Sequence, residues 1–144
     1  MQFDMNLSLG FILNRTSIQS KALFSQKIKE FDISPEQWSL VFRVVESEGL
    51  TQKELSDSTY KDQANTTRSI DRLEKKDLLR RVHNHNDRRI INIYPTKKAI
   101  DLVNMIVPIS SEFNNLLTKN FTIEEKEELI KLLNRVYENL QKEE

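Results

Sequence analysis

Residues 51–96, TQKELSDSTYKDQANTTRSIDRLEKKDLLRRVHNHNDRRIINIYPT, decide the fold of this 144-residue chain. Their first half holds two short helix patterns, which the turn-forming stretch 56–59 separates. Their second half holds two strand-like runs, 79–83 and 89–94, around the polar segment 84–88. Two helices followed by a basic hairpin are the layout of a winged helix-turn-helix, in which the second helix enters the major groove of DNA.

The second helix of this stretch is expected to run from a cap at Asp62 to about Lys76. Thr66, Ile70 and Leu73 recur at positions i, i+4 and i+7, so they form its buried stripe. The other faces of the helix are polar, which leaves them free to contact another molecule.

The flanking sequence is helical as well. Three capping boxes open at Ser34, Thr51 and Thr122, and Gly49 is expected to end a helix in a left-handed conformation. The predicted fold class is therefore mainly α with a small β-hairpin wing, a winged helix-turn-helix plus a helical dimerisation region. We expect one domain, 1–144, with the lobe at about 34–95 and dimerisation helices at about 7–30 and 96–144.

Charge is distributed unevenly along the chain. The 22 basic and 22 acidic residues cancel overall. Counted along the sequence, residues 61–98 hold 11 basic and 5 acidic side chains, net +6, whereas 1–60 hold 6 and 8 and 99–144 hold 5 and 9. A basic middle between acidic ends indicates a surface for a polyanion, although a solvated charged surface is the alternative.

Composition argues against several other classes. The absence of cysteine excludes disulfides, thiol nucleophiles and Cys-based zinc sites. No Gly-rich phosphate loop, GxSxG or HExxH motif is present, so we expect no enzyme activity and no cofactor. We also expect no signal peptide, no membrane span and a cytoplasmic location.

Apolar side chains near both ends predict a homodimer. They recur on the polar-faced helices that open and close the chain, and a monomer would leave them exposed to water. The predicted dimerisation residues are Leu9, Ile12, Leu13, Leu132, Leu133, Val136 and Leu140.

The stretch Asn65-Thr66-Thr67-Arg68-Ser69-Ile70-Asp71-Arg72-Leu73-Glu74-Lys75-Lys76, with the triplet Asp87-Arg88-Arg89, resembles the multiple-antibiotic-resistance regulator (MarR) family. The resemblance covers nearly the whole chain. It implies an obligate homodimer that binds double-stranded DNA and regulates transcription, usually as a repressor. It also implies a small, often aromatic, effector that binds between the dimer helices and the DNA-binding lobe and releases the DNA. This chain has Asp77 where the family usually has glycine.

The recognition helix supplies the first group of predicted DNA contacts. Gln63 and Asn65 suit adenine, Arg68 suits guanine, and Thr67 offers a hydroxyl and a methyl group to thymine or phosphate. Arg72 has two interpretations, a phosphate contact or an ion pair with a neighbouring acid, Asp71 or Glu74.

The wing supplies the second group. Arg89 matches the minor-groove arginine of the family, since a narrow groove of A·T pairs has enhanced negative potential. Arg88 and His85 are expected to contact the DNA backbone, and Asp87 to orient an arginine by a charge-assisted hydrogen bond. His83 and His85 share a strand face, but two ligands alone do not predict a metal site.

The main rival to this function is a winged-helix module that binds protein or RNA. The basic recognition helix favours duplex DNA.

Overall fold

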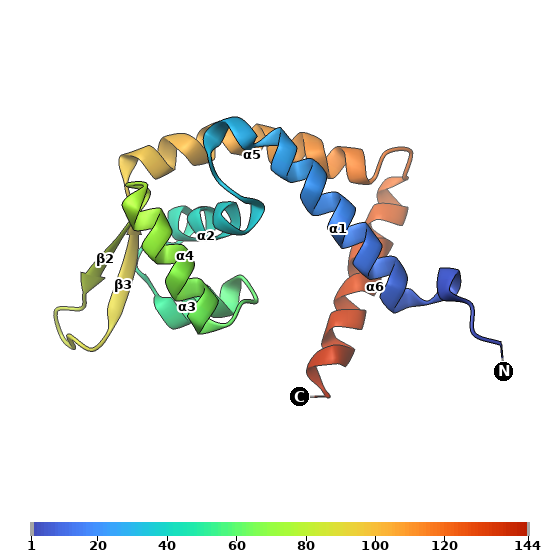
Figure 1. The fold of residues 1–144 in the computed structure, drawn as a ribbon, viewed down its shortest axis with the longest axis horizontal. Helices are drawn as coiled ribbons and strands as arrows, with labels where there is room; N and C mark the ends of the chain where they lie inside the picture. Colours follow the sequence, from blue (N-terminus) through green and yellow to red (C-terminus); the bar gives the residue numbers. More distant parts are fainter. Residues whose placement is uncertain (1, 144) are drawn as a thin grey trace. The chain divides into compact units, whose positions relative to one another are not determined.

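The computed structural model describes residues 2–143, and the chain divides into two compact units, Met1–Ile109 and Ser110–Glu144. The helices of the chain are η1 (Met5–Leu7), α1 (Leu9–Lys27), η2 (Lys29–Phe31), α2 (Pro35–Glu46), α3 (Gln52–Ser58), α4 (Gln63–Lys75), α5 (Lys97–Leu117) and α6 (Ile123–Gln141). The strands are β1 (Leu50–Thr51), β2 (Leu79–His83) and β3 (Ile91–Pro95). The order α2, α3, α4 and a β-hairpin confirms the predicted fold class, and Figure 1 shows the hairpin extending beside α4.

The sheet has one strand more than the sequence predicted. Its order is β1-β3-β2 and both pairings are antiparallel, with Leu50 opposite Ile93 and His83 opposite Ile91. β1 is too short to show the alternating pattern of a strand, so it could not be recognised before its partner was placed. It connects the hairpin to the start of α3.

Side-chain caps fix where the helices begin. Ser34 and Gln37 form the predicted capping box at α2, and Thr122 forms another at α6. Thr51 caps α3 as predicted, but its box is incomplete because the Glu54 carboxylate accepts from the Thr51 hydroxyl instead of from the backbone N–H. These caps place the start of each helix close to its predicted position.

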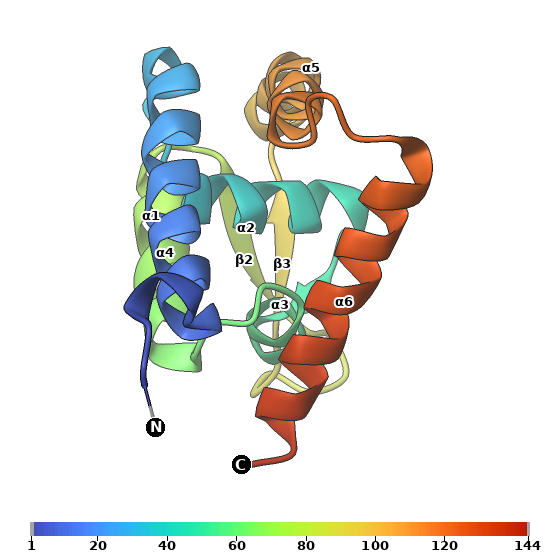
Figure 2. The ribbon, with the colours of Figure 1, turned by 90° about the vertical axis from the view of Figure 1, so that its right-hand side faces the viewer.

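The core of the first unit lies where the helices of the lobe meet the sheet. Figure 2 shows α2 crossing the hairpin strands, and α2 and β3 are in contact. The fully buried side chains include Leu40, Val41, Val44, Leu55, Ile70, Leu73 and Ile93. The predicted stripe of α4 is confirmed, since Thr66, Ile70 and Leu73 all have no exposed surface.

Two of the residues with positive φ, Asp77 and Gly49, lie at turns that follow helices. Asp77 follows α4 at φ 60°, the left-handed conformation that the family glycine would adopt with less strain. Gly49 has φ 85°, and a Cβ added there would lie 3.2 Å from the hydroxyl oxygen of Tyr94. The Gly49 N–H donates to the Ile93 carbonyl, and the Gly49 carbonyl accepts from the Asn92 amide. This turn therefore holds the end of α2 against the central strand.

The predicted dimerisation residues lie on surfaces with little apolar cover. Leu9, Leu132, Leu133 and Leu140 are exposed, and Ile12, Leu13 and Val136 are half-buried. Within Ile123–Gln141, all of which is described, no side chain is buried. α5 contains Pro108 within its helical span.

Candidate nucleic-acid interface

The start of α4 presents a row of polar side chains on one helix edge. Asp62 caps the helix, because its carboxylate accepts the backbone N–H of Asn65 at 2.8 Å. This hydrogen bond holds the pKa of Asp62 below its usual range. The Asn65 amide nitrogen donates to the same carboxylate at 2.6 Å, and Arg68 donates to the Asn65 amide oxygen. Asn65 and Arg68, two of the four predicted base-reading residues, are therefore engaged with each other, and a base would have to replace these contacts.

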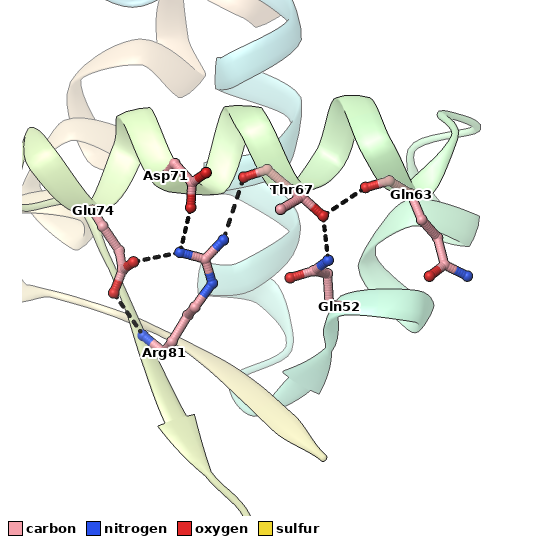
Figure 3. A network of polar contacts seen from close by, with 6 residues as sticks. All are labelled: Gln52, Gln63, Thr67, Asp71, Glu74 and Arg81. Carbon is pink, nitrogen blue, oxygen red and sulfur yellow. Dashed lines mark hydrogen bonds and ion pairs between the residues drawn. The ribbon is translucent and has the colours of Figure 1, made fainter. Parts of the chain in front are cut away.

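The other edge of α4 faces α3 and the hairpin. The Thr67 hydroxyl donates to the Gln63 carbonyl at 2.8 Å and accepts from the Gln52 amide of α3. Figure 3 shows the Gln63 side chain pointing away from this pair, so its amide stays available. Thr67 thus has a structural contact that the sequence did not reveal, because Gln52 lies 15 residues away.

The predicted recognition residues therefore divide between two surfaces. Asn65, Arg68 and Arg72 line a groove of about 350 Å³. The opposite wall of the groove contains the start of α2 and Lys61, a residue the sequence analysis did not select. Partial burial lowers the pKa of Lys61, and the nearby Glu36 carboxylate opposes that shift. The feature of the sequence that could have indicated Lys61 is its position directly before Asp62, the residue that caps α4.

One of the two interpretations of Arg72, the ion pair with a neighbouring acid, can be rejected. Asp71 and Glu74 form ion pairs with Arg81 of β2, so the predicted alternative that they pair with Arg72 is wrong. Across residues 2–143, Arg72 forms no salt bridge, and its side chain is exposed. The acids are nearer in sequence to Arg72, but the pleat of β2 directs Arg81 onto the helix.

The wing holds Arg89 in a defined orientation. The Asp87 carboxylate accepts from the Arg89 side chain through two hydrogen bonds of 3.0 Å, and from its backbone N–H at 3.0 Å. The bidentate contact lowers the pKa of Asp87 and raises that of Arg89. Because 91% of the Arg89 side chain is exposed, the guanidinium is oriented without being covered. The geometry expected for Asp87 is present, and its role on DNA stays a prediction.

The rest of the wing tip is held by hydrogen bonds between its own side chains and backbone groups. The Asn84 side-chain oxygen accepts from the N–H groups of Asn86 and Asp87, and a ring nitrogen of His83 lies 2.9 Å from the Arg88 carbonyl. His85 is exposed. In the part of the chain that the structure describes, no three His, Asp or Glu side chains gather as a metal site.

A second groove lies between the start of α3 and the base of the wing. It measures about 370 Å³ and its lining includes Thr51, Gln52, Lys53 and Arg89. Lys53 is exposed at the first turn of α3 and was not predicted. It brings a second cation to the edge of the wing that carries Arg89.

None of the helices in residues 2–143 has the length and apolar character that a membrane crossing requires.

Comparisons with known proteins agree with the winged helix-turn-helix fold. Residues 33–91 match the family model described as MarR family. The transcriptional regulator YybA of Bacillus subtilis is 24% identical over 81% of this chain and 78% of its own length. The regulator BilQ of Clostridioides difficile is 26% identical over 90% of this chain and 87% of its own. Both relatives are HTH-type transcriptional regulators and neither is named as an enzyme.

Solved structures share the fold over nearly the full length. A MarR protein of Peptoclostridium difficile, 27% identical, has a TM-score of 0.85 and covers 99% of this chain and 95% of its own. A probable transcriptional regulator of Pseudomonas aeruginosa, 25% identical, has a TM-score of 0.86 and covers 92% and 99%. The MepR–DNA complex of S. aureus, 24% identical, has a TM-score of 0.85 over 94% and 98%, which shows a shared fold.

Proposed function

This chain is a MarR-family transcriptional regulator, and from that premise we propose that it acts as a repressor, binding a pseudo-palindromic operator as a homodimer. The observation that carries the proposal is the placement of exposed arginines on two different elements of one compact unit, Arg68 on α4 and Arg89 on the wing. A helix and a neighbouring wing suit a major groove and the minor groove beside it.

Charge supports duplex DNA as the partner. Residues 61–98 carry a net charge of +6 by count, and this segment contains both α4 and the hairpin. Arg72, Arg88 and Lys53 add exposed cations around Arg68 and Arg89. We assign Arg88, His85 and Arg72 to the phosphates, and Gln63, Asn65, Thr67 and Arg68 to base edges.

The dimer is supported by the apolar surface of the helices outside the lobe. Leu132, Leu133 and Leu140 remain 43%, 42% and 61% exposed, and Leu9 in α1 remains 53% exposed. Soluble proteins seldom leave such a stripe in water, so a second copy of the chain is the proposed cover. A dimer would also present two recognition helices to half-sites about one helical turn, ~10 base pairs, apart.

A small aromatic effector is the third part of the proposal. A site between the dimer helices and the DNA-binding lobe would be lined by α1, by the α2 residue Trp38 and by the start of α5. The first unit has a cavity of about 440 Å³ at the start of α5, but its other walls are η2 and the end of α4. Trp38 instead packs near Phe42, with ring centroids 5.5 Å apart. Phe31 and Leu102 give this cavity apolar walls and Lys97 lies at its lining, which suits a small aromatic acid.

One structural neighbour gives this last part further support. BpsR of Bordetella bronchiseptica, 21% identical with a TM-score of 0.90 over 95% of this chain and 98% of its own, is described as regulated in DNA binding by 6-hydroxynicotinic acid. A ligand releases DNA only if it binds the DNA-free geometry better than the bound one. DNA must then weaken binding of the ligand by the same factor.

Selection of duplexes from a random library by the purified protein tests the function directly. We expect enrichment of a pseudo-palindrome with half-sites about 10 base pairs apart, bound by a species with the mass of a dimer. Single-stranded RNA serves as the competitor. Preferential retention of RNA, or no enriched duplex, would contradict the proposal and favour a winged-helix module for RNA or protein.

A further inference from the structure

One side chain of the hairpin makes contacts along two turns of the recognition helix. Arg81, in the middle of β2, donates to the Asp71 carboxylate at 2.7 Å and to the Glu74 carboxylate at 2.5 Å. A further guanidinium N–H donates to the Thr67 carbonyl at 3.3 Å, and the Arg81 backbone N–H donates to Glu74 at 3.3 Å. Figure 3 shows the guanidinium reaching from the strand onto the helix.

The same network continues into α3. The Thr67 carbonyl accepts from Arg81, while the Thr67 hydroxyl accepts from Gln52. Residue 67 therefore joins three elements, α3, α4 and β2, on the edge of the recognition helix that faces the wing. On the opposite edge, the hydrogen bonds that run from Asp62 through Asn65 to Arg68 are made within the start of the helix.

The burial of Arg81 argues against a direct DNA contact. Its side chain is 21% exposed, whereas the neighbouring Arg89 of the wing is 91% exposed. A guanidinium has five N–H donors in a fixed plane, and its orientation here is set by three acceptors of one helix. A phosphate would have to displace at least one carboxylate to reach it.

We propose that Arg81 is a positioning residue, which fixes the wing against the recognition helix and so determines how sharply the protein distinguishes its operator from other DNA. The inference rests on the proposed function and adds a residue that makes no base contact. Base edges and the minor groove must be read at the same time, so a hairpin that shifts relative to α4 loses one set of contacts when it makes the other.

A variant without the two carboxylates that Arg81 contacts distinguishes a positioning role of Arg81 from an effect of net charge. The variant is Asp71→Ala with Glu74→Ala, which raises the net charge by two and leaves Arg81 in place. If only charge matters, binding to the operator and to random duplex should both tighten. If Arg81 positions the wing, operator affinity should fall about ten-fold while random-duplex affinity does not fall. Glu127→Ala with Glu138→Ala, two exposed residues of α6, is the control with the same charge change.

Removal of the arginine gives an independent measurement. Arg81→Ala and Arg88→Ala each delete one positive charge of the hairpin, and binding is measured over a range of salt concentrations. A lost phosphate contact should weaken both duplexes equally and reduce the salt slope by about 1. We expect that result for Arg88→Ala. For Arg81→Ala we expect a selective loss of operator affinity with the wild-type slope on random duplex.

The outcomes are distinguishable. An unchanged ratio of operator to random affinity in the Asp71/Glu74 variant overturns the inference, and so does an Arg81→Ala salt slope that matches Arg88→Ala. Thermal unfolding checks that each variant is folded at the assay temperature, and the Asp71/Glu74 variant decides the question if Arg81→Ala does not fold. Failure of the wild-type protein to select any duplex would instead refute the proposed function.

Discussion

Helices α4 and α6 have the same amphipathic design and different surroundings. α4 places Thr66, Ile70 and Leu73 on one stripe, and all three are fully buried in the lobe. α6 repeats the pattern with Leu129, Leu132, Leu133, Tyr137 and Leu140, and each of these is 37% to 61% exposed. Periodicity therefore specifies that a helix has an apolar face, but it does not specify whether the same chain covers that face.

The largest effect should come from placing charge on the exposed stripe of α6. Leu133→Glu with Leu140→Glu would bring two carboxylates into the proposed dimer interface, where desolvation of unpaired charge is costly. We expect loss of the dimer at micromolar concentration and at least a ~100-fold loss of operator affinity, since half the contacts go with one protomer. Light scattering and gel shift measure the two effects.

The control for this variant is Lys131→Glu, which changes charge by two on the opposite face of α6. It should leave the dimer intact. A double-glutamate variant that still sediments as a dimer would show that the stripe has another role, and the contrast with α4 would then need a different explanation.

A substitution in the buried stripe of α4 should lower the free energy of unfolding and should not act through dimer assembly. Ile70→Ala removes a fully buried side chain, for which large-to-small substitutions typically cost about 2–5 kcal/mol in the free energy of unfolding. Urea denaturation at fixed protomer concentration measures this, with exposed Lys75→Ala on the same helix as the control. A loss below about 1 kcal/mol would mean that the lobe core tolerates a cavity at this position.

The exposed edge of α4 should affect recognition and leave stability unchanged. Arg68→Ala is expected to cost about 1–3 kcal/mol of operator binding and to relax the choice of one base pair. Selection with the variant protein, followed by affinity measurement on single-base substitutions, tests this. Normal affinity with an unchanged consensus would place Arg68 outside the DNA interface and give that position to another residue of the helix.

The smallest effect concerns the wing carboxylate. Hydrogen bonds from Arg89 lower the pKa of Asp87 below its ordinary value of 3.8. A depressed folded-state pKa means that the stabilising contribution is present above the ordinary value and is lost as pH falls through the lowered one. The contact should therefore persist at pH 5, and operator binding should not change between pH 8 and pH 5 through this group.

Carbon NMR of the Asp87 carboxyl group measures that titration. In Arg89→Ala the pKa should rise toward 3.8, whereas Arg88→Ala should leave it low. Equal values in the wild type and Arg89→Ala would show that the bidentate contact does not form in solution.

Much of the fold could be predicted from local sequence. The caps Ser34, Asp62 and Thr122 each bind a backbone N–H three residues later, so their effect depends on a few adjacent residues. The left-handed position after α4 was also predictable, because the family glycine marked it even though Asp77 occupies it here. Local signals of this kind need no knowledge of tertiary structure.

Much of the site could not be predicted, because its contacts join residues that are far apart in the sequence. Arg81 reaches Glu74 and Thr67 across 7 and 14 residues, and Gln52 reaches Thr67 across 15. Which of several nearby cations pairs with an acid depends on the direction of a strand pleat, so the pairing of Asp71 and Glu74 with Arg81 could not be predicted from sequence proximity. The two-residue strand β1 was missed because its existence depends on β3.

The turn at Gly49 has a consequence for the divergence of this protein. Its positive φ is strained for most L-residues, and a Cβ there would lie 3.2 Å from the hydroxyl oxygen of Tyr94, closer than an ordinary van der Waals contact. Two positions 45 apart in the sequence are thereby linked in their substitution history. Descendants that keep the tyrosine are expected to keep the glycine. Lineages that place asparagine or aspartate at position 49 are expected to carry a smaller residue at position 94, acquired first.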